Sequence, residues 1–319
     1  MARQAAAHAA AATNRREARM TTHDALRTGM IGLGAMGLPM GKTLIGKGFD
    51  VIGFDLDPAR RAKAAKAGLT VVESPAEVFR NSRVIIFSLP AAQHVRSVID
   101  NSGLLTDDMA FRIIIDTSTS EPQVSRDLAE ALGARGHGFL DAPVSGGPSG
   151  SASGQLSFMV GGDEAHFREA LPHFEAMGTK ILHVGGSGAG NVAKLVNNML
   201  VACHMLTTAE GLRLAEASGV GAADALRVVN AASGRSMLSE VHFPNWVLSG
   251  SFCSGFSAGL MRKDVRLALD LAGKVGADLP MAKLAQEIWA EDASGIANDE
   301  DFTRLGDPAL GQRTKAETH

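Results

Sequence analysis

The sequence predicts an α/β fold in which a doubly wound parallel sheet is followed by an all-helical C-terminal domain. Short apolar runs rich in β-branched residues alternate with helical patterns through the first half of the 319-residue chain, and such alternation is typical of parallel sheets. A glycine-rich stretch then leads into a long segment with helical periodicity, from about residue 191 to residue 218. Because no strand pattern follows this segment, we expect only helices beyond it.

The composition is that of an ordinary globular chain. Apolar residues make up 45% and charged residues 20%, and the net charge of -3 gives no basic footprint for nucleic acid. No apolar run reaches the ~18 residues of a membrane span. The two cysteines, Cys203 and Cys253, are too few for a disulfide framework or a cysteine-based metal site. We therefore expect a cytoplasmic protein with no nucleic-acid, membrane or metal partner.

The stretch "MIGLGAMGLPM" places Gly32, Gly34 and Gly37 at G-x-G-x-x-G spacing. A strand is expected before it, at 26–31, and apolar residues at helical spacing follow it. The next strand ends in Asp55, 18 residues after Gly37, about where a Rossmann fold places the acid that binds the adenosine ribose. Gly32 permits the tight turn, Gly34 admits the pyrophosphate and Gly37 allows close helix–strand packing. The context therefore predicts a Rossmann-type sheet that binds a dinucleotide.

Asp55 also predicts which dinucleotide binds. A carboxylate there accepts a hydrogen bond from a free 2′-hydroxyl and repels a 2′-phosphate, so NAD is favoured over NADP. Arg60 and Arg61 follow closely, and arginines near this position can bind a phosphate. We expect them to be solvated charges on the next helix, with NADP as the less favoured alternative.

Further strands are expected at 83–89 and 112–118, with additional candidates at 71–74 and 138–146. The segments "SLP", "DTSTS" and "DAPVSGG" all lie at the ends of these strands. Ligands of such sheets bind beyond the carboxyl ends of the strands. We therefore expect the three segments to converge on one crevice.

The segment at 191–218 predicts one long interdomain helix of roughly 40 Å at 1.5 Å per residue. Lys194 and Asn198 are four residues apart in its first turns and therefore share one face. Asn197 is one residue out of register and is expected to cap or pack. A solvated lysine is the ordinary interpretation of such a residue, but the glycine-rich entry and the neighbouring asparagine favour a functional one.

Four segments are expected along the chain. Residues 1–28 are rich in alanine and arginine and lack the apolar core of a signal peptide. We interpret them as a disordered or mis-started extension; a mitochondrial transit peptide is the alternative, although serine is absent there. An NAD-binding Rossmann domain follows at 29–187, then a helical substrate and dimerisation domain at 188–306 and a tail at 307–319. Long helices with apolar residues on faces that look exposed indicate a homodimer or homotetramer.

Four motifs occur in order: "GLGAMG" (32–37), "DAPVSGGPSGSASGQL" (141–156), "GAGNVAKLVNN" (188–198) and "RKDVRLA" (262–268). With them the chain, from about Gly29 to about Gly295, resembles the β-hydroxyacid dehydrogenase family. That family includes 3-hydroxyisobutyrate dehydrogenase, tartronate semialdehyde reductase and L-threonate dehydrogenase. His94 stands at a cofactor-side position where relatives often carry asparagine, which leaves its role open. Met237 stands where a family stretch frequently ends in tryptophan, which indicates an altered pocket wall and leaves the identity of the substrate open.

The resemblance implies a role for each matching residue. Lys194 matches the catalytic lysine, and Asn198 matches an asparagine that orients the substrate. The loop that takes the substrate carboxylate matches Ser145, Gly146 and Gly147. The residues implied to bind the cofactor are Gly32, Leu33, Gly34, Ala35, Met36, Gly37, Asp55, Leu89, Pro90, Thr119 (near the nicotinamide) and Lys263 (with Asp264 beside it).

The resemblance also implies the reaction. A hydride would pass between NAD and a small 3-hydroxyacid resembling 3-hydroxyisobutyrate, or the corresponding semialdehyde, while Lys194 removes or returns the hydroxyl proton. Tartronate semialdehyde reductase and L-threonate dehydrogenase activities are the alternatives. A non-catalytic cofactor-binding interaction module is an alternative of another class, but it would be expected to lose the lysine or the "DAPVSGG" loop. Imine reductases are a rival enzyme class of the same fold, and Lys194 argues against them because they usually lack this lysine.

Overall fold

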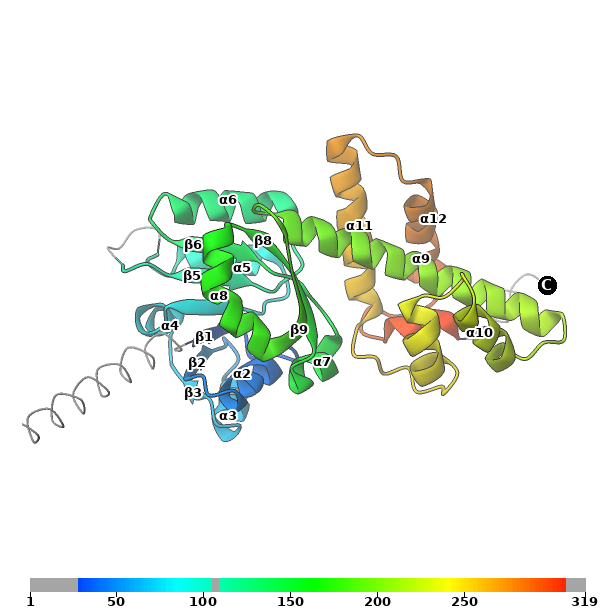
Figure 1. Cartoon of the computed structure of the whole chain (residues 1–319), viewed down its shortest axis with the longest axis horizontal. Helices are drawn as coiled ribbons and strands as arrows, with labels where there is room; N and C mark the ends of the chain where they lie inside the picture. The colour runs from blue at the N-terminus through cyan, green and yellow to red at the C-terminus, as the bar shows by residue number, and fades with distance from the viewer. Residues whose placement is uncertain (1–27, 105–108, 308–319) are drawn as a thin grey trace, which may run out of the picture. The chain divides into compact units, whose positions relative to one another are not determined.

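The computed structural model describes residues 28–104 and 109–307, which form two compact units that divide between Asn191 and Val192 (Figure 1). Our expectations for residues 1–27 and 308–319 lie outside the described residues. Thr28, which we had assigned to the extension, is the first residue of β1.

The sheet of the first unit is doubly wound. Its parallel strands lie in the order β3-β2-β1-β4-β5-β6, so the order reverses between β1 and β4. This reversal is the topological switch point beside which such folds bind their ligands, and it confirms the Rossmann-type prediction. The strands are β1 (Thr28–Ile31), β2 (Val51–Phe54), β3 (Thr70–Val71), β4 (Val84–Phe87), β5 (Ile113–Asp116) and β6 (Gly138–Asp141).

The sheet continues beyond β6. The strand candidate at 138–146 contains both β6 and the short β7 (Val144–Ser145), whereas the two strands that follow were not predicted. β8 (Leu156–Gly162) is antiparallel to β6 and to β7, and β9 (Gly178–Gly185) pairs with β8. The sheet is therefore mixed rather than wholly parallel. Residues 146–155 join β7 to β8, and a parallel pair needs a connection of a dozen or more residues. The short connection, which contains only the helix α7 (Gly147–Ser153), explains the antiparallel direction.

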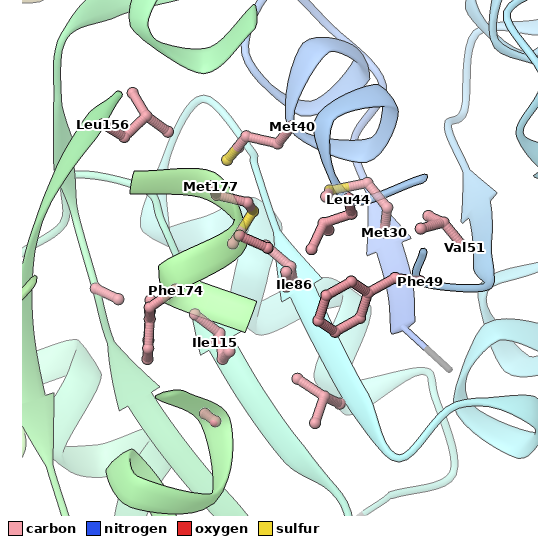
Figure 2. Close-up of a cluster of buried hydrophobic side chains, with 14 of the residues drawn as sticks. Met30, Met40, Leu44, Phe49, Val51, Ile86, Ile115, Leu156, Phe174 and Met177 are labelled. Carbon is pink, nitrogen blue, oxygen red and sulfur yellow. The ribbon is translucent and has the colours of Figure 1, made fainter. Parts of the chain in front are cut away.

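Helices cover both faces of the sheet because successive strand residues point to opposite sides. Met30 and Ile86 belong to one apolar cluster, whereas Ile31 and Ile85 belong to another. Figure 2 shows the first cluster, in which Met40 and Leu44 of one helix and Phe174 and Met177 of another lie against the strands. The helices on this face are α2 (Gly37–Gly46), α3 (Pro58–Lys66) and α8 (Glu164–Met177); those on the other are α4 (Pro75–Asn81), α5 (Ala92–Asp100) and α6 (Pro122–Gly133).

The second unit is helical throughout its described residues apart from one isolated β-bridge, between Ser257 and Asp301, as predicted. Its core surrounds the buried Trp289, whose indole Nε1 donates to the carbonyl of Ala202 at 3.2 Å. None of the helices in the described part of the chain has the length and apolar character that a membrane crossing requires. The helices are α9 (Ala189–Ala217), α10 (Ala222–Ala231), a π-helix (Leu238–Val247), α11 (Ala258–Val275), α12 (Pro280–Trp289), α13 (Glu291–Ser294) and a 3-10 helix (Phe302–Gly306).

The stability of the first unit is expected to depend on His173, a buried residue of α8 whose ring centroid lies 4.8 Å from that of Phe49. Burial lowers the pKa of His173 to about 4, and a backbone contact at Ala170 only partly offsets this effect. In the unfolded chain the imidazole titrates near 6.5. Because the folded-state pKa is the lower one, the neutral ring contributes stability above pH 6.5, and this stability is lost as the pH falls toward 4.

Lowering the pH from 7.5 to 5 is therefore expected to cost about 2 kcal/mol of unfolding free energy through His173. His173→Leu, which removes the titrating group, is expected to reduce the pH dependence by that amount. Urea unfolding followed by circular dichroism measures this pH dependence. Tryptophan fluorescence would not report on the first unit, because Trp246 and Trp289, the two tryptophans of the chain, lie in the second unit. An equal pH dependence in the variant and the wild type would contradict this account.

Candidate functional site

The glycine loop between β1 and α2 is shaped by close backbone approaches. A Cβ at Gly32 would lie 2.2 Å from the carbonyl oxygen of Ser88, and a Cβ at Gly37 would lie 1.9 Å from that of Gly32. Gly32 also has φ +92°, a conformation that favours glycine. A Cβ at Gly34 would meet only Arg60, at 3.5 Å. Packing thus requires Gly32 and Gly37, whereas Gly34 leaves room that a phosphate can occupy.

Asp55 at the end of β2 holds this loop in place. Its Oδ2 accepts a hydrogen bond from the backbone N–H of Leu33 at 2.7 Å, and its Oδ1 accepts one from Asp57 at 2.9 Å. The carboxylate is buried. The acid therefore lies against the glycine loop, as the motif spacing requires for a ribose ligand, and its contact with a ribose stays a prediction.

The two arginines after Asp55 differ from each other. Arg60 is 53% exposed, with Nη1 3.6 Å from Asp55 Oδ2. Arg61 is only 20% exposed; its guanidinium donates to the carbonyl of Asp55 at 2.8 Å and lies 5.7 Å from the ring centroid of Phe54. Our expectation that both arginines are solvated was wrong for Arg61, because that side chain ties the start of α3 (Pro58–Lys66) to the end of β2.

The segments after β4, β5 and β6 start at the same edge of the sheet, and the crevice that they are expected to share stays a prediction. Phe87, Asp116 and Asp141, the last residues of these strands, are in register with one another. Ser118 Oγ accepts a hydrogen bond from the N–H of Leu89 at 3.2 Å, which joins two of these segments. The cofactor-binding roles implied for Leu89, Pro90 and Thr119 are consistent with this placement and stay predictions.

The loop predicted to take a carboxylate lies beside the glycine loop. Gly146 and Gly147, at the start of α7, have φ of +125° and +61°. Ser151 in α7 donates its hydroxyl to the carbonyl of Met36 at 2.9 Å, and Thr43 in α2 donates to the carbonyl of Ser151 at 2.8 Å. These bonds connect the Ser145–Gly147 segment, through α7, to the first turns of α2.

The second unit contains a buried polar cluster around Lys194. Lys194 is 7% exposed, Asn198 is 4% exposed and Asp264 is 1% exposed. Asn198 Nδ2 donates to Asp264 Oδ2 at 2.5 Å, and Lys263 Nζ lies 3.3 Å from Asp264 Oδ1. Asn197, which we expected to cap or pack, donates instead to Asn198 Oδ1 at 3.0 Å. Sequence reasoning noted Asp264 only as a neighbour of Lys263; its place in the "RKD" motif was the available signal.

The electrostatics of this cluster suit proton transfer. Burial lowers the pKa of Lys194 from 10.5 to about 8; the negative charge of Asp264 opposes the shift and the positive charge of Lys263 adds to it. An amine with a pKa near the working pH can both accept and donate a proton. Among the described residues, no three His, Cys, Asp or Glu side chains gather where they could bind a metal ion.

Two family models match the chain. The NAD binding domain of 6-phosphogluconate dehydrogenase matches residues 27–185. A second model, described as NAD-binding of NADP-dependent 3-hydroxyisobutyrate dehydrogenase, matches residues 188–308. Together the two models span the two units.

Relatives cover most of the chain. An NAD-dependent L-serine dehydrogenase from Pseudomonas aeruginosa is 37% identical over 88% of this chain and 98% of its own length. A 2-(hydroxymethyl)glutarate dehydrogenase from Eubacterium barkeri is 38% identical over 83% of this chain and 88% of its own. The solved structure of a Mycobacterium tuberculosis 3-hydroxyisobutyrate dehydrogenase with L-serine has a TM-score of 0.82 and 36% identity, and the match covers 88% of this chain and 98% of that one.

The glycine loop yields a prediction that separates folding from ligand binding. Gly34→Ala is expected to leave the melting temperature of the ligand-free protein nearly unchanged, because its Cβ meets only a flexible arginine. It is expected to weaken NAD binding about tenfold or more, roughly 1.4 kcal/mol, because the methyl group occupies the space left for the pyrophosphate. Gly37→Ala is expected to lower the melting temperature, since its Cβ would clash with a backbone carbonyl. Thermal melts and calorimetric titration with NAD measure both effects. Wild-type NAD affinity in Gly34→Ala would place the pyrophosphate elsewhere.

Proposed function

The chain belongs to the β-hydroxyacid dehydrogenase family, and we propose from this premise that it oxidises the hydroxyl group of a small 3-hydroxyacid with NAD. The observation that carries the proposal is the buried Lys194, whose pKa is lowered to about 8 beside Asp264 and Asn198. Removing a hydroxyl proton needs a base that is partly neutral near physiological pH. Desolvation makes this lysine such a base.

The residues of the first unit fit a dinucleotide. Gly34 leaves room for a pyrophosphate, and the first turn of α2 has no side-chain cap, which leaves backbone N–H groups for an anion. We assign the ribose to Asp55 and further cofactor contacts to Leu89–Pro90, Thr119 and Lys263. NAD, when bound, supplies the acceptor for the hydride.

Lys194 then carries the proton. Its neutral Nζ accepts the hydroxyl proton during oxidation, and its ammonium form returns the proton in the reverse reaction. Asn198 is held from two sides, by Asn197 and Asp264, and is therefore preorganised to orient the substrate. The Asp264 carboxylate stabilises the protonated lysine and prevents its pKa from falling further.

The substrate carboxylate is assigned to the Ser145–Gly147 segment. Successive backbone N–H groups in such glycine-rich turns can form a concave site for an anion. The positive φ angles of Gly146 and Gly147 support this assignment, because side chains there would strain the turn.

The substrate is proposed to be a 3-hydroxyacid similar to 3-hydroxyisobutyrate, or its semialdehyde. The names of the relatives indicate a range of small hydroxyacids that includes L-serine and 2-(hydroxymethyl)glutarate. Tartronate semialdehyde reductase and L-threonate dehydrogenase activities are the alternatives within the family. The intact cluster around Lys194 argues against a non-catalytic binding module.

A homodimer or homotetramer is also proposed. The second unit exposes several large apolar side chains, and such surface is commonly buried against another subunit. Val196 and Leu200, four residues apart on α9, are 47% and 45% exposed, and Val228 on α10 and Met281 on α12 are 68% and 60% exposed. A cytoplasmic location stays a prediction.

A substrate screen tests the reaction. NAD reduction, followed at the absorbance of NADH, is measured with 3-hydroxyisobutyrate, L-serine, glycerate, L-threonate and 4-hydroxybutyrate, and each assay is repeated with NADP. We expect turnover with at least one 3-hydroxyacid and a higher kcat/KM with NAD. Unmeasurable turnover with every substrate and both cofactors would overturn the proposed function.

Lys194→Ala is expected to lower kcat by about 10²–10⁴-fold, the usual contribution of general acid–base catalysis, and to leave the Kd of NAD nearly unchanged. Lys194→Arg is not expected to restore turnover, because a guanidinium keeps its proton at working pH. The wild-type oxidation rate is expected to rise with pH through about 8, as the amine becomes neutral. Near-normal turnover in the arginine variant would reduce Lys194 to an electrostatic anchor, and in the alanine variant would remove it from the mechanism.

A further inference from the structure

The first turn of α9 is held by a buried carboxylate. Asp141, at the end of β6, is 0% exposed. Its Oδ1 accepts a hydrogen bond from the N–H of Gly188 at 2.7 Å, and its Oδ2 accepts one from the N–H of Asn191 at 2.8 Å. The first N–H groups of a helix have no partners within the helix, and Asp141 supplies two acceptors at this position.

Asn191 forms a second attachment for the same turn. Its side-chain Oδ1 accepts a hydrogen bond from the N–H of Ser120 at 2.9 Å, and its Nδ2 donates to Ser125 Oγ at 3.0 Å. Asn191 is fully buried. The segment after β5, the helix α6 and the end of β6 therefore all bind one turn of helix.

Glycines allow this close approach. A Cβ at Gly190 would lie 2.3 Å from the carbonyl oxygen of Met159 and 2.4 Å from that of Asp141. A Cβ at Gly161, on β8, would lie 2.6 Å from Asp141 Oδ1. The start of α9 thus packs backbone to backbone against β6 and β8, and a single added methyl group would displace it.

This arrangement has a cost. Burial raises the pKa of Asp141 to about 6, although hydrogen bonds from backbone N–H groups partly offset the shift. A buried carboxylate whose hydrogen bonds come only from neutral groups is expensive to desolvate. What it secures is the position of a helical turn, and Lys194 follows Asn191 by three residues, less than one turn along the same helix.

We propose that Asp141 and Asn191 are positioning residues for Lys194, and that they act through the first turn of α9. The inference rests on the proposed function, since it assumes that Lys194 carries the proton. A displacement of about 1 Å of a catalytic group can lower the rate on the order of 100-fold. A looser first turn of α9 is therefore expected to lower kcat. Gly34 and Asp55, to which the pyrophosphate and the ribose are assigned, lie at other strand ends, so NAD affinity is expected to change much less than kcat.

Asp141→Asn tests the inference, because a carboxamide offers one acceptor oxygen where the carboxylate offers two. Amide hydrogen exchange without substrate is expected to become several-fold faster in residues 186–194 and to stay unchanged in residues 205–217. kcat is expected to fall about 10–100-fold, with the KM and Kd of NAD within about twofold of wild type. A merely structural role would not separate kcat from NAD binding in this way.

The control is Asp163→Asn. Asp163 also accepts hydrogen bonds from N–H groups in the first turn of a helix, but that helix is α8, where its Oδ1 accepts from Ala165 at 2.8 Å and from His166 at 3.1 Å. This variant is expected to leave hydrogen exchange across α9 unchanged. If Asp141→Asn does not fold, Asn191→Asp is used instead; it keeps the acceptor for Ser120 and loses the donor to Ser125, and a smaller effect of the same pattern is expected.

Hydrogen exchange at the wild-type rate in residues 186–194 of Asp141→Asn would overturn the inference, and so would faster exchange with unchanged kcat. Faster exchange with lower kcat and unchanged NAD binding supports it. The exchange measurement needs no turnover. A wild-type protein that oxidises no hydroxyacid therefore overturns the proposed function, whereas unchanged exchange in Asp141→Asn overturns only this inference.

Discussion

The first unit depends on backbone segments that approach one another too closely for side chains. A Cβ at Gly37 would lie 1.9 Å from the carbonyl oxygen of Gly32, and one at Gly190 would lie 2.3 Å from that of Met159. Both contacts occur where the chain leaves a strand and enters a helix. The first sets the start of α2 and the second sets the start of α9, so the helices that follow take their positions from glycine. Within the glycine loop after β1, Gly32 and Gly37 serve packing, whereas the missing side chain of Gly34 leaves space.

Buried polar groups form the second level of organisation. Each such group loses its contacts with water on burial and needs polar partners in the protein instead. Asp141 accepts hydrogen bonds from two backbone N–H groups, whereas Asp264 accepts one from Asn198 and forms an ion pair with Lys263. The consequence for Lys194 is a balance: burial lowers its pKa and Asp264 raises it, leaving the pKa at about 8. With burial alone the amine would be a weaker base, and with solvent exposure it would remain protonated.

The sequence predicted features that depend on nearby residues and missed those that join distant ones. The strands through β6, the glycine loop and α9 follow from periodicity and spacing within about 25 residues. The bonds that Asp141 and Asp264 make join residues 50 and 66 apart in the chain, and no local pattern encodes them. β8 was missed as well; its pairing with β6 and β9 joins segments that lie about 20 residues apart in the chain. The expectation for Arg61 failed because the side chain packs on the carbonyl of Asp55 and the ring of Phe54, contacts that leave no charge pattern in the sequence; its charged partner, Glu73, lies 12 residues away.

Asp55 shows how cofactor preference and loop structure become linked. The carboxylate that is expected to accept the ribose hydroxyl already accepts N–H groups from Leu33 and Asp57. An asparagine at this position would keep one acceptor oxygen and present an N–H₂ group to the other donor. The substitution would therefore remove the repulsion of a 2′-phosphate, which favours NADP binding, and would also loosen the glycine loop, which weakens it. Arg60, 3.6 Å from the carboxylate, could bind a phosphate only if the loop stayed in place. A change of cofactor in this chain thus requires a second substitution that restores the lost acceptor.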